Sequence, residues 1–252
     1  MTEMESDKQR WKLQEEQYEF PYHHIPHFKA PEVPSLIRAL RWGMEYLCYQ
    51  HHAIERTREL NPRSVLEVGC GDGYFIGHLG DDIPVRHGVD LAEQAIQFAR
   101  AFHPEVAFDP VNAARLDDTY DVVVAMEVLE HVPDEKLGSF LEAVEERVRP
   151  GGRLLISVPT TVIPLKDKHF RHYTWELLNQ QIAAHTSLRP VDHEYIYREG
   201  HLLRILRGAV HNSVYVLRSD TLNRLLWKYI WTRARFAGPA DGYHLFATFR
   251  KS

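Results

Sequence analysis

The sequence is poor in cysteine, has no long apolar run and shows no excess of positive charge. Two cysteines among 252 residues, Cys48 and Cys70, are too few for a disulfide framework, so we expect a reducing compartment. No segment approaches the roughly 20 consecutive apolar residues that span a bilayer, and the first residues lack a signal-peptide pattern. We therefore expect a cytoplasmic protein without a membrane partner.

The charge balance excludes some partners in the same way. A formal net charge of −5 gives no general attraction to nucleic acid or to acidic membranes, although a local basic patch is compatible with it. Nucleic acid is therefore an unfavoured partner. The hydrophobic share of 44% and the charged share of 26% suit one large soluble domain with a sizeable core.

What the sequence does contain is a glycine-dense turn, spaced G-x-G-x-G, within residues 65–75. The segment predicts a short apolar strand, a turn and the start of a helix. Glycine suits a turn that must adopt positive φ and let its backbone approach a ligand. Asp90 ends a second apolar run about 20 residues later, the spacing of an acid that binds ribose hydroxyls. Together these features predict a pocket for an adenine nucleoside.

Glu67, within the first predicted strand, indicates which nucleoside cofactor the predicted pocket binds. A nicotinamide dinucleotide needs a pyrophosphate seat, normally G-x-G-x-x-G, and a nearby carboxylate would repel it. The same carboxylate is favourable beside the amino and sulfonium groups of S-adenosylmethionine. Residues 67–73, Glu-Val-Gly-Cys-Gly-Asp-Gly, resemble motif I of the class I S-adenosylmethionine-dependent methyltransferases.

Further segments resemble that family in the same order, over about residues 61–185. Residues 85–91 resemble its second strand, and residues 149–159 resemble its fifth strand with the preceding turn. Asn112 and Ala113 lie where the family places an adenine contact, although aspartate is usual in place of Asn112; an Asn can still hydrogen-bond an amino group. The cofactor contacts that the resemblance implies are Glu67, Gly69, Cys70, Gly71, Gly73, Asp90, Leu91, Asn112, Ala113, Met126 and Glu127.

The predicted fold is α/β. Short apolar runs alternate with amphipathic stretches over residues 65–158, which predicts βαβ units. The resemblance implies a Rossmann-like seven-stranded sheet with helices on both faces. Residues 1–60 are expected to form an N-terminal arm and helix that cover the acceptor, and residues 61–252 the methyltransferase domain. A helical insertion at about 199–237 precedes the last strand; it is core packing, a homodimer face or a lid.

A second motif follows the fourth predicted strand. A helical turn beginning there would place Glu127, Glu130 and His131 on one face, at the carboxyl edge of the sheet. Two carboxylates and an imidazole suit Mg²⁺, Mn²⁺ or Zn²⁺. The E-x-x-E-H pattern resembles the O-methyltransferases of ubiquinone biosynthesis and the 2′-O-methyltransferases of small RNA 3′ ends, which implies a divalent ion on these three residues. Related sequences also occur in methyltransferases without a known metal; His131 is then the leading general base.

Other histidines extend the set of candidates. His169 and His172, just beyond the fifth strand, are bases, ligands or structural residues. His23, His24 and His27 of the arm are candidates to close the site, whereas the mid-helix pair His51 and His52 is expected at the surface.

These patterns predict an O-methyltransferase, with His131, His169 and Glu130 as the catalytic candidates. A hydroxyl acceptor needs a base or a metal to remove its proton, whereas an amine does not. The acceptor side is rich in Tyr, Trp, His and Arg, which favours a small polyhydroxylated molecule, a saccharide ahead of a phenol. The alternatives are RNA 2′-O-methylation, which requires a basic track for phosphates, and a catalytically silent cofactor-binding subunit.

Overall fold

An eight-stranded sheet organises the computed structural model, which describes residues 27–35, 40–210, 217 and 219–252. The strand order is β5-β4-β3-β6-β7-β10-β8-β9; β5 to β7 pair in parallel, and β10 is antiparallel to both β7 and β8. The strands are β3 (Ser64–Val68), β4 (Val85–Val89), β5 (Ala107–Asp109), β6 (Tyr120–Met126), β7 (Val148–Pro159), β8 (Arg189–Ile196), β9 (Phe236–Ala237) and β10 (His244–Arg250).

The Rossmann-like α/β prediction is confirmed, but the expected count of seven strands is wrong. The additional strand is the two-residue β9, which pairs with the end of β8 at the sheet edge. Its pairing joins residues about 40 positions apart, which no local sequence pattern announces.

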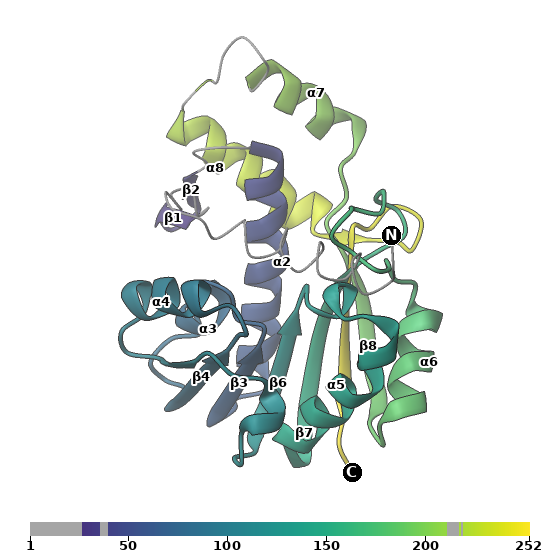
Figure 1. Ribbon diagram of the computed structural model, residues 1–252. Helices are drawn as coiled ribbons and strands as arrows, with labels where there is room; N and C mark the ends of the chain where they lie inside the picture. The colour runs from purple at the N-terminus through teal and green to yellow at the C-terminus, as the bar shows by residue number, and fades with distance from the viewer. Residues whose placement is uncertain (1–26, 36–39, 211–216, 218) are drawn as a thin grey trace.

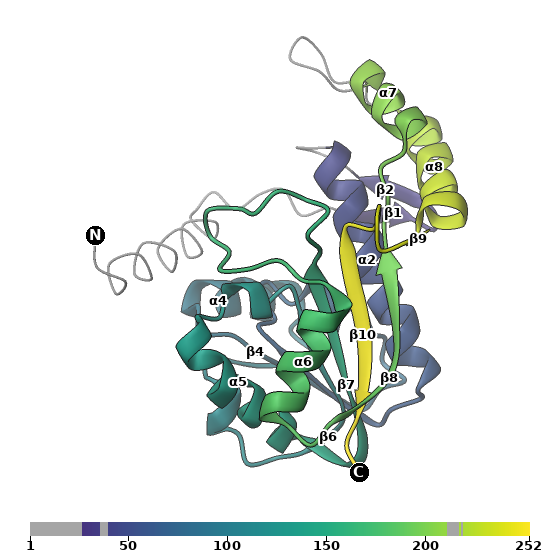
Figure 2. The ribbon, with the colours of Figure 1, turned by 90° about the vertical axis from the view of Figure 1, so that its right-hand side faces the viewer.

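Helices cover both faces of the sheet (Figures 1 and 2). One face carries α2 (Leu40–Glu59), α3 (Tyr74–Gly77) and α4 (Glu93–Phe102), and the other carries α5 (Asp134–Arg147) and α6 (Trp175–His185). In β6, Val122 and Val124 join the first core, whereas Val123 and Ala125 join the second. A strand buried on both faces needs apolar residues at every position, which explains the continuous apolar run in the sequence.

The N-terminal part of the described chain is a hairpin of β1 (His27–Ala30) and β2 (Val33–Ser35). Phe28 packs edge-on against His51 and Trp227, with ring centroids 4.6 and 4.8 Å apart. The arm residues His23 and His24 lie outside the described residues, and His27 lies in β1.

His52 corrects one expectation, because it is fully buried rather than on the surface. Its Nδ1 accepts a hydrogen bond from Arg235 Nε at 3.0 Å, and its Nε2 lies 3.1 Å from Glu194 Oε2. Periodicity alone did not reveal which side of α2 packs on the sheet.

The predicted helical insertion contains α7 (His201–Val210), α8 (Asp220–Tyr229) and the π-helical turn η3 (Ile230–Ala234). It lies beyond the carboxyl edge of the parallel strands, at the opposite end of the molecule from the C-terminus (Figure 1). Among the described helices, none combines the length and the apolar character needed to cross a bilayer.

Candidate functional site

The loop after β3 is held against the ends of two neighbouring strands. Gly69, Gly71 and Gly73 have φ values of 75°, 53° and 78°, in the left-handed region that favours glycine. The N–H groups of Gly69 and Cys70 donate to Val89 O of β4 at 2.7 and 3.0 Å. A Cβ added at Gly69 would lie 2.4 Å from Val128 Cγ2. The glycine loop therefore packs directly on the segment after β6, which carries the second motif.

Asp90 joins this loop to the end of β4. Its Oδ2 accepts from Gly71 N and its Oδ1 from Ala92 N, both at 2.9 Å. Burial raises the pKa of this carboxyl group, and the backbone donors partly oppose that shift. The neighbouring Leu91 is 54% exposed and free to cover a flat ring. A carboxylate fixed at this edge fits the binding of a ribose diol.

Glu67 is buried at the carboxyl end of β3, with Oε2 accepting from Ile76 N at 3.2 Å. Burial raises its pKa well above the ordinary value. A buried carboxylate with one protein donor fits a cationic ligand group, whose charge would offset the cost of ionisation. Cys70 lines the loop with its backbone only. Its Sγ packs beside β4, where a Cβ added at Gly88 would lie 2.9 Å from that sulfur.

Asn112 begins the 3₁₀ turn η1 (Ala113–Arg115), just beyond β5. Its Oδ1 caps the turn by accepting from Ala114 N at 3.0 Å, which leaves the same oxygen a second lone pair. Asn112 is exposed and Ala113 is buried. Asp90 N donates to Asp109 O at the end of β5, so this turn lies beside the ribose-binding candidate.

Glu127 does not share a helical face with Glu130 and His131, and the expectation of one helical turn is wrong. It follows Met126, the buried last residue of β6, with a φ of 56°, a strained conformation for a residue with a side chain. Its N–H donates to Ser157 O at 2.8 Å, which helps to hold that conformation. Only Leu129–His131 form a helical turn, the 3₁₀ turn η2.

The Glu127 carboxylate belongs to a separate, partly buried network. Its Oε1 accepts from Ser157 Oγ at 2.7 Å and from His244 Nδ1 at 3.0 Å, and His244 Nε2 lies 3.1 Å from Glu45 Oε1 of α2. Burial lowers the pKa of His244, but the two carboxylates outweigh burial and raise it to about 10. Burial raises the pKa of Glu127, and His244 reverses that shift, so the net direction is downward.

Sequence reasoning missed three members of this network: Glu45, Ser157 and His244. A single histidine at the start of an otherwise apolar strand was the available signal for His244. No signal connected it to Glu127, which lies 117 positions away.

Glu130, His131 and His169 come together at the carboxyl edge of the sheet, each offering a ligand atom within 4.8 Å of the others. His131 Nε2 lies 3.8 Å from Glu130 Oε1. Glu130 is 1% exposed, and its Oε2 has no hydrogen-bond partner among the described residues. An orphaned buried carboxylate oxygen between two imidazoles fits a cation or a shared proton.

Backbone carbonyls determine the tautomers of these imidazoles. Lys168 O accepts from His131 Nδ1 at 3.1 Å, so the lone pair of neutral His131 is on Nε2. Ile163 O accepts from His172 Nδ1 at 3.1 Å, so His172 Nε2 accepts from His169 Nδ1 at 2.8 Å. The lone pair of His169 is therefore also on Nε2.

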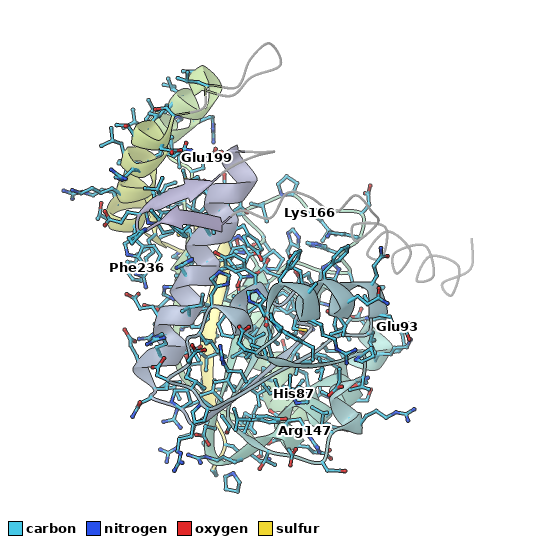
Figure 3. The ribbon with its side chains drawn as sticks, turned by 90° about the vertical axis from the view of Figure 1, so that its left-hand side faces the viewer. His87, Glu93, Arg147, Lys166, Glu199 and Phe236 are labelled. Carbon is cyan, nitrogen blue, oxygen red and sulfur yellow. The ribbon has the colours of Figure 1, made fainter. Side chains whose placement is uncertain are left out.

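Burial, followed by the charge of Lys168, lowers the pKa of His131 to about 4. Burial, followed by His131, lowers the pKa of His169 to about 2. Both imidazoles are therefore neutral near pH 7, as a base or a metal ligand must be. The loop that carries His169 lies at the end of the sheet nearer the insertion; Figure 3 shows its Lys166 there, with His87 and Arg147 toward the other end.

A family model described as a methyltransferase domain matches residues 40–229, most of the chain. The chain belongs to this methyltransferase family. The match includes the glycine loop, Asp90 and the Glu130 cluster, and S-adenosylmethionine is the cofactor that this membership supports.

Curated relatives of this methyltransferase include two named ubiquinone biosynthesis O-methyltransferases. The one from Alkalilimnicola ehrlichii is 31% identical over 70% of this chain and 76% of its own length. The one from Vibrio atlanticus is 28% identical over 62% of this chain and 66% of its own length. The similarity thus leaves about a third of the Vibrio relative unmatched.

Among solved structures, magnesium protoporphyrin IX methyltransferase from Synechocystis PCC 6803 with bound S-adenosylmethionine superimposes with a TM-score of 0.55. The superposition covers 86% of this methyltransferase and 87% of that chain at 13% identity. At that identity the likeness shows the shared fold alone.

Proposed function

We propose that this methyltransferase transfers a methyl group to a hydroxyl of a small polyhydroxylated acceptor, a saccharide or a sugar-bearing metabolite. The single observation that carries the proposal is the meeting of Glu130, His131 and His169 beside the glycine loop. A hydroxyl must lose its proton during transfer, and neutral His131 offers it a lone pair on Nε2. Burial makes this imidazole a weaker base than a free histidine, so the neighbouring Glu130 carboxylate would have to stabilise the imidazolium that forms. Amine methylation would not need such a group.

The cofactor would be held by the residues around the glycine loop. Asp90 would bind the ribose hydroxyls, and Glu67 would face the amino and sulfonium groups. Leu91, Asn112 and Ala113 would border the adenine. When bound, S-adenosylmethionine supplies an electrophilic methyl group. The protein then mainly orients the acceptor and takes up its proton.

The same cluster would hold a divalent cation through Glu130, His131 and His169, a set that differs from the expected one by His169 in place of Glu127. An acidic oxygen and two imidazole nitrogens are ligands typical of Mn²⁺ or Zn²⁺, and Mg²⁺ accepts the carboxylate. Such an ion would supply Lewis-acid chemistry toward an acceptor hydroxyl.

The relatives favour a second acceptor class. Both relatives described above are named for ubiquinone biosynthesis, so a phenol is the alternative to a saccharide. Residues 1–60 would cover the acceptor in either case.

The test is a transfer assay with labelled S-adenosylmethionine and saccharide, phenolic and short RNA acceptors, with and without Mg²⁺. Glu130→Gln combined with His131→Gln should lower turnover by about 100-fold or more while cofactor affinity is unchanged. His193→Gln, an exposed imidazole remote from the cluster, is the matched control. Normal turnover in the double variant would refute the catalytic assignment, and activity surviving exhaustive EDTA would remove the metal.

A further inference from the structure

The helical insertion exposes aliphatic side chains as well as burying others in the core. In α7, Leu203 is buried and Leu206 packs against the core, whereas Leu202 and Ile205 are 53% and 69% exposed. In α8, Leu226 is buried but Leu225 is 60% exposed. Each helix thus has an apolar arc of which only one side reaches the protein interior.

Basic residues accompany this exposed aliphatic surface. Residues 198–236 contain eight Lys or Arg and two Asp or Glu, a net charge of +6 in a chain whose net charge is −5. Arg224 and Lys228 are exposed on α8, and neither forms an ion pair with another described residue. Arg198, Arg204 and Arg235 are ion-paired with acidic residues, so the exposed positive charge of α8 is that of Arg224 and Lys228.

The insertion lies at one end of the molecule, although its inner side packs on the hairpin of β1 and β2 through Trp227 and Asn223. Figures 1 and 2 show α7 and α8 at one end, beyond the carboxyl edge of the sheet. A flat partner can therefore approach the end of the molecule formed by the two helices that carry the exposed Leu202, Ile205 and Leu225.

We propose that α7 and α8 bind the surface of an anionic lipid membrane, with Leu202, Ile205 and Leu225 inserted among the acyl chains and Arg224 and Lys228 facing the lipid headgroups. Amphipathic helices with basic polar faces bind membranes in this orientation. The inference goes beyond the proposed function and does not depend on it. It revises the expectation of no membrane partner, which rested on the charge averaged over the whole chain.

The charges and side chains disfavour the other occupants. A second copy docked through the same face would bring Arg224 and Lys228 of both copies close together, and this repulsion between like charges costs free energy. RNA-binding surfaces that lack sequence preference stack bases on aromatic rings, whereas the large exposed hydrophobic residues of α7 and α8 are leucine and isoleucine.

The experiment is co-sedimentation of the full chain with vesicles, without cofactor or acceptor. We expect the protein to pellet with vesicles of phosphatidylcholine and phosphatidylglycerol in equal parts, but not with phosphatidylcholine alone. Added salt should release it, because exposed charges are screened. Absence of binding at low salt, or equal binding to both vesicle types, would overturn the proposal.

Substitutions test which residues of α7 and α8 contact the vesicle surface. Leu202→Gln with Ile205→Gln should weaken partitioning by about tenfold or more, since two aliphatic side chains lose their transfer into lipid. Leu60→Gln, an exposed leucine beyond α2, is the control. Arg224→Gln with Lys228→Gln should weaken binding and flatten its salt dependence, whereas Arg189→Gln on β8 should do neither. Circular dichroism and cofactor affinity check that each variant is folded.

Unchanged partitioning of both double variants would overturn the assignment to this face. A dimer seen by light scattering that Leu202→Gln with Ile205→Gln dissociates would show that a second copy occupies it instead. Binding of a short RNA that requires Arg224 and Lys228, without vesicle binding, would replace the membrane by nucleic acid.

Discussion

Asp90 and Glu130 are both carboxyl groups at the carboxyl edge of the sheet, and burial raises the pKa of each. Their surroundings otherwise differ. Both oxygens of Asp90 accept backbone N–H bonds, from Gly71 and Ala92, which favour the ionised form. Glu130 Oε2 is buried with no hydrogen-bond partner among the described residues, and the charge of Glu127 raises its pKa further. Asp90 is thereby suited to bind neutral hydroxyls, and Glu130 to take up a proton or a cation.

Asp90→Ala should weaken S-adenosylmethionine binding by about 10- to 100-fold, because a hydrogen bond to a charged group contributes about 1.5–3 kcal/mol. Isothermal titration calorimetry measures the change. Asp118→Ala, at an exposed position, is the control, and thermal unfolding confirms that both variants fold. An unchanged dissociation constant for Asp90→Ala would refute the ribose assignment.

Among the elements, the contact between the loop after β3 and the segment after β6 joins the cofactor residues to the catalytic candidates. Gly69 has a positive φ and no room for a Cβ beside Val128. Gly151, in the β7 segment, has a φ of 78°, but a Cβ added there would meet nothing within 4 Å. Substitutions at these two glycines therefore distinguish the cost of backbone strain from the cost of a close side-chain contact.

Gly151→Ala should cost about 1–2 kcal/mol, the penalty of a left-handed conformation with a side chain. Gly69→Ala should cost more, and it alone should weaken cofactor binding, because Val128 and the loop must move apart. Urea unfolding and calorimetry measure the two effects. If both variants lost the same stability and bound the cofactor equally well, Val128 would move aside at little cost and the prediction for Gly69 would be wrong.

At the scale of the whole molecule, His244 links three distant parts of the chain. It bridges Glu45 of α2 and Glu127 at the end of β6 from the start of β10. Its pKa is raised from 6.5 to about 10, so its stabilising contribution is complete below about pH 6.5 and is lost as the pH rises through about 10. Glu127, whose pKa is lowered, contributes above its ordinary value of 4.5. The ion pair therefore stabilises the fold most between these limits.

His244→Gln should lower the free energy of unfolding near pH 7 by about 3–5 kcal/mol, because two partly buried carboxylates lose their buried cationic partner. The difference from the unaltered protein should shrink as the pH rises through about 10. Denaturant unfolding at a series of pH values measures it, with the exposed His193→Gln as control. A pH-independent difference would show that packing, rather than charge, makes His244 stabilising.

The sequence by itself determined the features that depend on neighbours along the chain. Strand β3, its glycine turn and Asp90 follow from apolar runs, positive φ and a spacing of about 20 residues, which are local properties. Helix α5 lies within the alternating stretches that predict βαβ units, and Thr174 caps α6 through a contact three residues along the chain, accepting from Leu177 N at 3.3 Å. Such interactions need no knowledge of how distant segments meet.

Tertiary structure alone decided which distant side chains face one another. It separated Glu127 from Glu130, brought His169 to the cluster, buried His52 and added β9 to the sheet. It also left one side of α7 and α8 exposed, although their periodicity is that of ordinary core helices. Periodicity reports that a face is apolar, but what covers that face depends on the path of the whole chain.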